Sequence, residues 1–345
     1  MRIAVDGERR VSGLALIGRA VDGFGNALDG LPPPSARTRP LPHDAPAPRE
    51  RRPLREPLWT GIRAIDGLLT FVRGMRVGIF GQPGSGKSSL LAAIAAGIDA
   101  DAVVVALVGE RGSEARRHVT SCDARTTVVC APSDRNAEER LMAGDFALAH
   151  AAVLRAKGLD VAVIFDSLAR YVEAAREAAL LRGEPPGRAG YPASVWPRLA
   201  RLCECAGATA RGSITLVATV LSDAADASDP LAEAARAILD GHVVLSRRRA
   251  ERGIFPAIEV PASLSRPMRE AVGHAHLAAA RRVTAALGRL EDSREARELG
   301  LLVAEPVLSR AVAAEEALEA FLRQGAEPEP PASTLSRLAQ IADTV

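Results

Sequence analysis

Residues 76–88 read Arg-Val-Gly-Ile-Phe-Gly-Gln-Pro-Gly-Ser-Gly-Lys-Ser. The first five suit a buried strand, and residues 81–88 match the pattern G-x-x-x-x-G-K-[ST], which leads from a strand into a helix. Glycines at these positions let successive backbone N–H groups and the start of the helix point at phosphate oxygens. The stretch therefore predicts a P-loop in an α/β fold.

The loop residues carry specific expectations. We expect Lys87 to be catalytic by reaching the β- and γ-phosphates, and the Ser88 hydroxyl to ligate Mg²⁺. ATP and Mg²⁺ are therefore the predicted cofactors. The predicted nucleotide-binding residues in this loop are Gly81, Gln82, Pro83, Gly84, Ser85, Gly86, Lys87, Ser88 and Ser89.

Short apolar runs recur on both sides of the loop. Strands are predicted at 76–80, 102–108, 127–130, 161–165, 214–220 and 242–245. Several of these runs are apolar throughout, as is typical of parallel strands covered by helices on both faces. Residues from about 58 to 268 therefore predict an α/β sheet domain.

The composition changes on both sides of this domain. Residues 1–30 predict two or three short strands joined by glycine turns. Residues 31–57 contain nine prolines, the composition of an extended linker. Residues 270–345 are rich in Ala, Leu, Arg and Glu and predict a small helical domain, interrupted at 325–331.

Two carboxylates follow predicted strands. Asp166 ends the run 161–165 as in a Walker B strand, whose carboxylate holds the Mg²⁺ hydration shell. Glu110 follows 102–108 and could orient the water that attacks the γ-phosphate. From the local sequence alone, a surface pair between Glu110 and Arg111 is the simpler interpretation.

Composition limits the class of protein. The chain has 345 residues and a formal net charge of +2, and its 3% aromatic content disfavours a dedicated binder of single-stranded nucleic acid. The four cysteines lack the spacing of a structural zinc site. No apolar run approaches the roughly 20 residues that cross a bilayer, and no signal peptide is recognised. We expect a cytoplasmic protein with at most peripheral membrane contact.

Motifs along the chain resemble the type III secretion and flagellar protein-export ATPases, which are related to the catalytic subunit of rotary ATP synthases. Examples are Ala-Leu-Val-Gly-Glu-Arg-Gly at 106–112 and Asp-Ser-Leu-Ala-Arg at 166–170. The resembling stretches are 55–69, 77–80, 106–112, 166–170, 183–186, 190–192, 238–242, 255–258 and 263–266. The resemblance keeps the order and approximate spacing of the family over roughly residues 13–324.

The resemblance implies a RecA-like P-loop fold that assembles into a hexameric ring. It implies that Glu110 is the catalytic carboxylate, and that Arg111 beside it and Arg170, which faces the phosphates, are catalytic residues too. Arg266 is implied to be an arginine finger. Phe255 is implied to pack against the adenine.

The resemblance also implies a domain order: residues 1–30 a remnant of an N-terminal β-barrel, 31–57 a Pro/Arg-rich linker, 58–269 the RecA-like ATPase domain and 270–345 a C-terminal helical domain. Family members carry a longer N-terminal barrel, so we expect a truncated start or a reduced crown of the ring. Phe255 and Glu259 stand where Tyr and Asp are usual, which removes no charge from the chemistry.

The implied function is ATP hydrolysis that energises injectisome or flagellar protein export by releasing chaperones and unfolding export substrates. The implied partners are copies of the chain, stalk and stator proteins, chaperones and substrates, with no nucleic acid, at the cytoplasmic face of the inner membrane. Two alternatives stay open: a Rho-like RNA translocase using the arginine-rich stretch 49–55, and a ring subunit that binds nucleotide without hydrolysing it. The presence of Lys87 and Glu110 favours catalysis.

Overall fold

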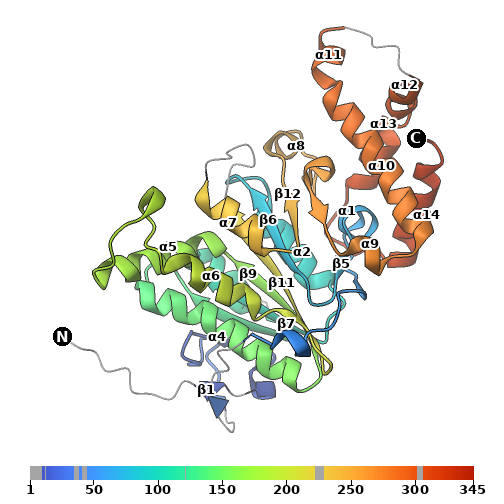
Figure 1. The fold of residues 1–345 in the computed structure, drawn as a ribbon. Coiled ribbons are helices and arrows are strands. Elements are labelled where there is room, and N and C mark those ends of the chain that lie inside the picture. Colours follow the sequence, from blue (N-terminus) through green and yellow to red (C-terminus); the bar gives the residue numbers. More distant parts are fainter. Residues whose placement is uncertain are drawn as a thin grey trace. The chain divides into compact units, whose positions relative to one another are not determined.

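The computed structural model describes residues 10–11, 13–34, 39–40, 45–120, 122–221, 229–300 and 306–345. It shows a mixed α/β fold, as predicted (Figure 1). The chain forms two compact units. Unit 1 comprises the described residues up to Pro53, Ala100–Val220 and Pro230–Ile238, and unit 2 comprises Leu54–Asp99, the described ends of Leu221–Asp229, and Leu239–Val345.

Unit 1 is built on parallel strands in the order β11-β9-β7-β8-β2. These are β2 (Ala20–Val21), β7 (Ala102–Val108), β8 (Thr126–Ala131), β9 (Asp160–Asp166) and β11 (Ser213–Leu221), with β10 (Gly207–Ala208) antiparallel to β11. Every residue of β7 is buried, which explains its continuous apolar run.

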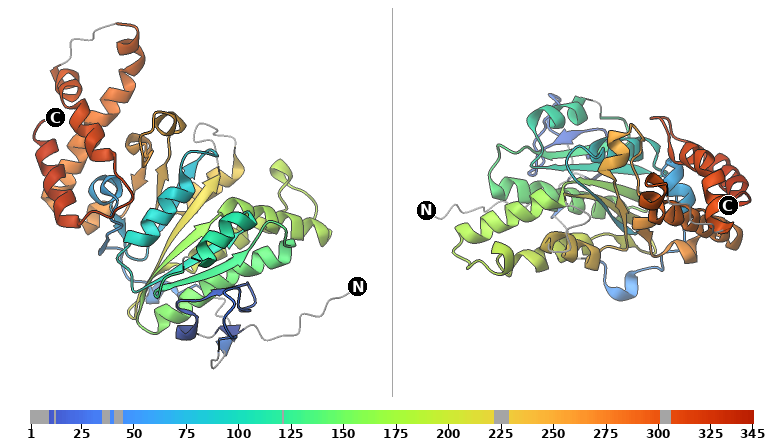
Figure 2. Two further views of the ribbon diagram at one scale, coloured as in Figure 1. Left: turned by 180° about the vertical axis from the view of Figure 1, so that it is seen from behind. Right: turned by 90° about the horizontal axis from the view of Figure 1, so that it is seen from above.

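The helices of unit 1 cover these strands. They are η1 (Gly13–Leu16), η2 (Pro48–Glu50), α3 (Gly112–Thr120), α4 (Ala137–Ala156), α5 (Leu168–Leu181), η3 (Arg188–Gly190), α6 (Val195–Glu204) and α7 (Pro230–Ile238). The long helix α4 starts with a capping box between Asn136 and Glu139. It packs along β7, β8 and β9, with α5 beside it (Figure 2).

The N-terminal part holds short strands, as the sequence predicted. Besides β2, the described strands there are β1 (Arg10–Val11) and β3 (Arg39–Pro40), which pair antiparallel; residues 1–9, 35–38 and 41–44 lie outside the described part. Residues 45–53 of the predicted linker belong to unit 1. Arg51 donates hydrogen bonds to the Glu204 carboxylate at 2.7 Å and to the Ala206 carbonyl at 3.1 Å. This part of the linker is therefore anchored.

Unit 2 contains three strands in the order β13-β12-β6 and a separate antiparallel pair, β4 and β5. Their bounds are β4 (Pro57–Leu58), β5 (Phe71–Val72), β6 (Arg76–Gly81), β12 (Gly241–Val244) and β13 (Leu264–Ser265). The helices before residue 272 are α1 (Arg63–Leu68), α2 (Lys87–Gly97), α8 (Arg247–Glu251), η4 (Val260–Ala262) and α9 (Met268–Ala271).

The C-terminal part of unit 2 is helical, as predicted. Its helices are α10 (His274–Asp292), α11 (Arg294–Glu298), α12 (Pro306–Ala313), α13 (Glu315–Leu322) and α14 (Pro331–Ala342). The predicted interruption falls in the turn between α13 and α14. In the described part of the chain, no helix has the length and apolarity that crossing a membrane requires.

Candidate active site

The phosphate-binding pattern forms a closed turn between β6 and α2. Gly84 and Gly86 have φ of 81° and 91°, a left-handed conformation that strains residues other than glycine. Buried Ser85 donates from Oγ to the Gln82 carbonyl at 2.8 Å. The predicted strand-turn-helix context of the motif is therefore present.

Lys87 lies along the inside of this turn. Its Nζ donates hydrogen bonds to the carbonyls of Gly81 and Gln82, both at 2.7 Å. Ser88 and Ser89, at the start of α2, are exposed. A helix N-terminus supplies free backbone N–H donors and the positive end of the helix dipole. The N-terminus of α2 therefore suits an anionic phosphate.

Phe255 lies beside the loop, within unit 2. A Cβ placed on Gly86 would be 3.4 Å from the Phe255 ring. The Phe255 side chain is exposed. A flat aromatic surface of this kind can stack on a nucleotide base. The adenine-packing role of Phe255 stays a prediction.

Glu110 and Arg170 form an ion pair in unit 1. Glu110 follows β7 and is buried, while Arg170 lies in the first turn of α5; Glu110 Oε2 and Arg170 Nη1 are 3.0 Å apart. The same Nη1 also donates to the Gly109 carbonyl. A Cβ on Gly109 would lie only 3.1 Å from Arg170 Cδ, so glycine allows this close approach. The pair fixes the direction of the Glu110 carboxylate.

Asp166 stands at the end of β9, in the same unit. Its neighbour across the β7–β9 register is Leu107, three residues before Glu110. Thr219 Oγ1 donates to Asp166 Oδ1 at 2.5 Å. Burial, followed by the negative charge of Asp166 and a hydrogen bond with Glu114, raises the pKa of Glu110 to about 8.

The predicted Mg²⁺ ligands have suitable chemistry. Ser88 contributes a hydroxyl oxygen, and Asp166 contributes a carboxylate. Mg²⁺ prefers such hard oxygen donors and commonly takes one or two from the protein beside water and substrate phosphates. Each of the two side chains, taken by itself, is a donor of the kind that this ion prefers.

The two remaining predicted arginines differ in their surroundings. Arg111 is exposed, and its carbonyl accepts from Glu114 N at 2.9 Å at the start of α3. Glu110 pairs with Arg170, so the interpretation of Glu110 and Arg111 as a surface pair is wrong.

Arg266 is exposed and follows the edge strand β13. Its backbone N–H donates to the Asp240 carbonyl at 3.2 Å.

Residues 61–265 match the model of the ATP synthase alpha/beta family, nucleotide-binding domain. The chain is 42% identical to the flagellum-specific ATP synthase of Pseudomonas aeruginosa, covering 97% of this chain and 77% of the relative. It is 41% identical to the type 3 secretion system ATPase of Pseudomonas syringae pv. syringae, covering 95% and 76%. The chain belongs to this family, among its type III secretion and flagellar export ATPases.

Solved structures agree with this assignment to the export ATPases. The assembled ATPase EscN of the enteropathogenic E. coli type III secretion system matches with a TM-score of 0.91 at 36% identity, over 96% of this chain and 82% of that one. EscN in complex with its central stalk EscO matches with a TM-score of 0.90 at 35% identity, over 97% and 83%. The RecA-like P-loop fold expected from the sequence is confirmed.

Sequence reasoning missed three residues around the carboxylates of this export ATPase. Glu114 hydrogen-bonds Glu110, and Thr219 holds Asp166. Burial lowers the pKa of His118, while the charges of Asp166 and Glu114 oppose that shift. Glu114 and His118 follow Glu110 at spacings of four and eight, one helical face, which could have indicated them. Thr219 carries no such local signal.

The raised pKa of Glu110 predicts a pH dependence of turnover. A carboxylate accepts a hydrogen bond from water better when ionised, and ionisation becomes complete only above the pKa of about 8. We expect kcat to rise between about pH 7 and pH 9. Glu110→Gln should retain ATP binding and lose turnover over this whole range. Wild-type turnover in assembled Glu110→Gln would remove Glu110 from the catalytic role.

Proposed function

We propose that the chain hydrolyses ATP to energise type III protein export, in an injectisome or a flagellum. The observation that carries the catalytic part is buried Glu110 held against Arg170. A subunit that only binds nucleotide does not need a fixed, buried carboxylate at this motif. The export part is supported by relatives named as flagellar and type III secretion ATPases.

The proposed roles follow the chemistry of each group. Lys87 and the N–H groups of the loop bind the phosphates, and Glu110, oriented by Arg170, positions the attacking water. Ser88 and Asp166 would hold Mg²⁺, which supplies positive charge to the β- and γ-phosphate oxygens. Phe255 stacks on the adenine. We assign no role to Arg111 beyond the helix start.

We propose that the working form is a hexameric ring, in which Arg266 acts on the ATP of the adjacent subunit. EscN has been solved as an assembled ATPase and with its central stalk, which supports self-assembly and a stalk partner for this chain. Stator proteins, chaperones and export substrates are the further proposed partners, at the cytoplasmic face of the inner membrane. We also propose the four domains expected from the sequence, at residues 1–30, 31–57, 58–269 and 270–345.

The Rho-like alternative predicts a different response to RNA. We expect turnover per chain to rise with chain concentration, because a neighbouring copy completes each site, and to change less than twofold on addition of single-stranded RNA. In the arginine-rich stretch, Arg51 is already bonded to Glu204 and Ala206. The measurement is phosphate release with and without polyuridylate at several salt concentrations. A large stimulation that falls with rising salt would favour the RNA translocase.

A further inference from the structure

Phe255 is carried on a loop whose base is fixed close to the P-loop. The 246–257 loop leaves the sheet after β12 and returns where Leu245 and Ile258 form an antiparallel bridge. The Leu245 N–H donates to the Phe80 carbonyl at 2.8 Å, one residue before the P-loop begins. The base of the loop is therefore set by β6. The position of the ring depends on what holds the far part of the loop.

Gln324 holds the loop at Phe255 itself. The backbone N–H of Gln324 donates to the Phe255 carbonyl at 2.9 Å. Its side chain is anchored at both ends: Oε1 accepts from Arg63 N at 2.8 Å, and Nε2 donates to the Gly61 carbonyl at 2.7 Å. The amide group thus ties residue 324 to the start of α1, and this anchoring presents the N–H to Phe255.

Arg63 reinforces the same turn. Its buried guanidinium donates to the Phe321 carbonyl at 2.8 Å and pairs with Glu329 at 2.5 Å. The bond to Phe321 satisfies a carbonyl at the end of α13, where the helix has no N–H donor of its own to offer it. The turn that carries Gln324 is therefore rigidly held against α1.

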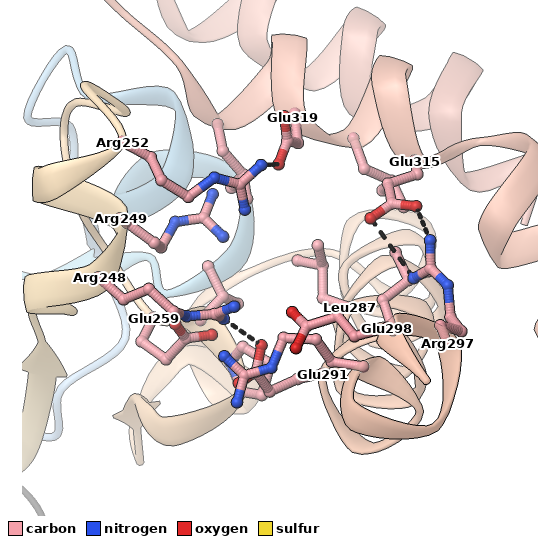
Figure 3. A pocket seen from close by; sticks show the side chains of 16 residues that line it. Arg248, Arg249, Arg252, Glu259, Leu287, Glu291, Arg297, Glu298, Glu315 and Glu319 are labelled. Atoms are coloured by element: carbon pink, nitrogen blue, oxygen red, sulfur yellow. Dashed lines mark hydrogen bonds and ion pairs between the residues drawn. The ribbon is translucent and has the colours of Figure 1, made fainter. Parts of the chain in front are cut away.

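Ion pairs link the same loop to the C-terminal helices more weakly. In Figure 3, Arg248 reaches Glu291 of α10 at 2.6 Å and Arg252 reaches Glu319 of α13 at 3.8 Å. All four side chains are partly exposed, so solvent screens these pairs and they hold the loop only weakly. The hydrogen bond from Gln324 is the contact made at Phe255 directly.

We infer that Gln324 is a positioning residue for the nucleotide base: anchored by its amide group, it fixes Phe255 beside Gly86 and so sets the affinity for the adenine. This inference rests on the proposed function, since Phe255 is taken to stack on the base. It adds that the turn after α13, in the C-terminal helical part, determines recognition of the base, whereas binding of the phosphates does not depend on this turn.

The test compares a ligand that has a base with one that has none. Titration calorimetry on the full chain measures the Kd of ADP and of inorganic pyrophosphate. For Gln324→Ala we expect the Kd of ADP to rise about five- to tenfold, the usual effect of a lost anchoring hydrogen bond, and that of pyrophosphate to change less than twofold. KM for ATP should rise with kcat unchanged, since binding is lost equally in ground and transition states. Gln340→Ala, the same change at an exposed position of α14, is the matched control and should alter neither.

A double-mutant cycle separates positioning from a general structural effect. In a Phe255→Ala background, Gln324→Ala should raise the Kd of ADP by less than twofold, because the ring it positions is gone. If Gln324→Ala does not fold, Gln324→Glu takes its place, since it keeps the acceptor for Arg63 N and loses the donor to Gly61. An unchanged Kd of ADP, an equal loss for both ligands, or full additivity with Phe255→Ala would overturn the inference. A wild-type chain that binds neither ligand would instead refute the proposed function.

Discussion

Replacing Lys87 by alanine is expected to abolish ATP turnover and to weaken ATP binding. The Lys87 ammonium lies inside the P-loop, at the carbonyls of Gly81 and Gln82, from where it can move to the phosphate oxygens. Removing one preorganised donor that stabilises developing charge, as in an oxyanion hole, typically costs about 10²–10³ in kcat. We therefore expect at least this loss.

The measurement is phosphate release together with the Kd of ATP. Lys157 is the other lysine of the chain, and it is exposed at the end of α4. Lys157→Ala removes the same charge elsewhere and should keep the wild-type rate. A Lys87→Ala chain with more than a tenth of wild-type turnover would contradict the role given to this lysine.

Arg266→Ala is expected to keep ATP binding and to lose turnover by about 10³–10⁵, the range found for arginine fingers. Arg266 is exposed after the edge strand β13, where a second chain can meet it. As the proposed arginine finger, its guanidinium would stabilise charge on two γ-phosphoryl oxygens at once, so Arg266→Lys should not restore the rate.

The neighbouring Arg269 is the matched control. It is exposed and pairs with Glu270 at 3.8 Å, the kind of surface contact that contributes about 1 kcal/mol or less. Arg269→Ala should therefore retain turnover within about twofold. If Arg266→Ala also keeps the full rate, Arg266 is a surface residue and has no part in the reaction.

Mixing the two inactive variants tests whether Arg266 acts on a neighbour. Assemblies of Arg266→Ala with Lys87→Ala contain interfaces where an intact Lys87 meets an intact Arg266, so some activity should return. Absence of recovery in assemblies shown to contain both chains would contradict action between subunits.

Most of the sheet could be predicted from local sequence. The run 102–108 forms β7 with the predicted bounds, and the other five predicted strands are shifted by at most one residue at either end. Their continuous apolar character is a strong local signal because both faces are buried. The strands β10 and β13 were missed, since two residues are too few to show any periodicity.

The candidate site was predictable where one short stretch carries the chemistry. The P-loop is such a stretch, and its turn has the expected conformation. The partner of Glu110 was not predictable from position alone: Arg111 is adjacent in sequence, but the pairing of β7 with β9 brings Arg170 to the carboxylate. Gln324 lies 261 residues from Arg63, and no local pattern indicates such a contact.

The central claim is that this chain hydrolyses ATP at the P-loop and that a neighbouring copy completes the site. The most direct test is phosphate release per chain from ATP and Mg²⁺, without nucleic acid, measured over a range of chain concentrations with Lys87→Ala as the blank. We expect a rate that rises with concentration and reaches a plateau as the assembly forms. Hydrolysis would be contradicted if the rate were no higher than that of Lys87→Ala at every concentration. Completion of the site by a neighbour would be contradicted if the protein stayed monomeric and its rate per chain did not depend on concentration.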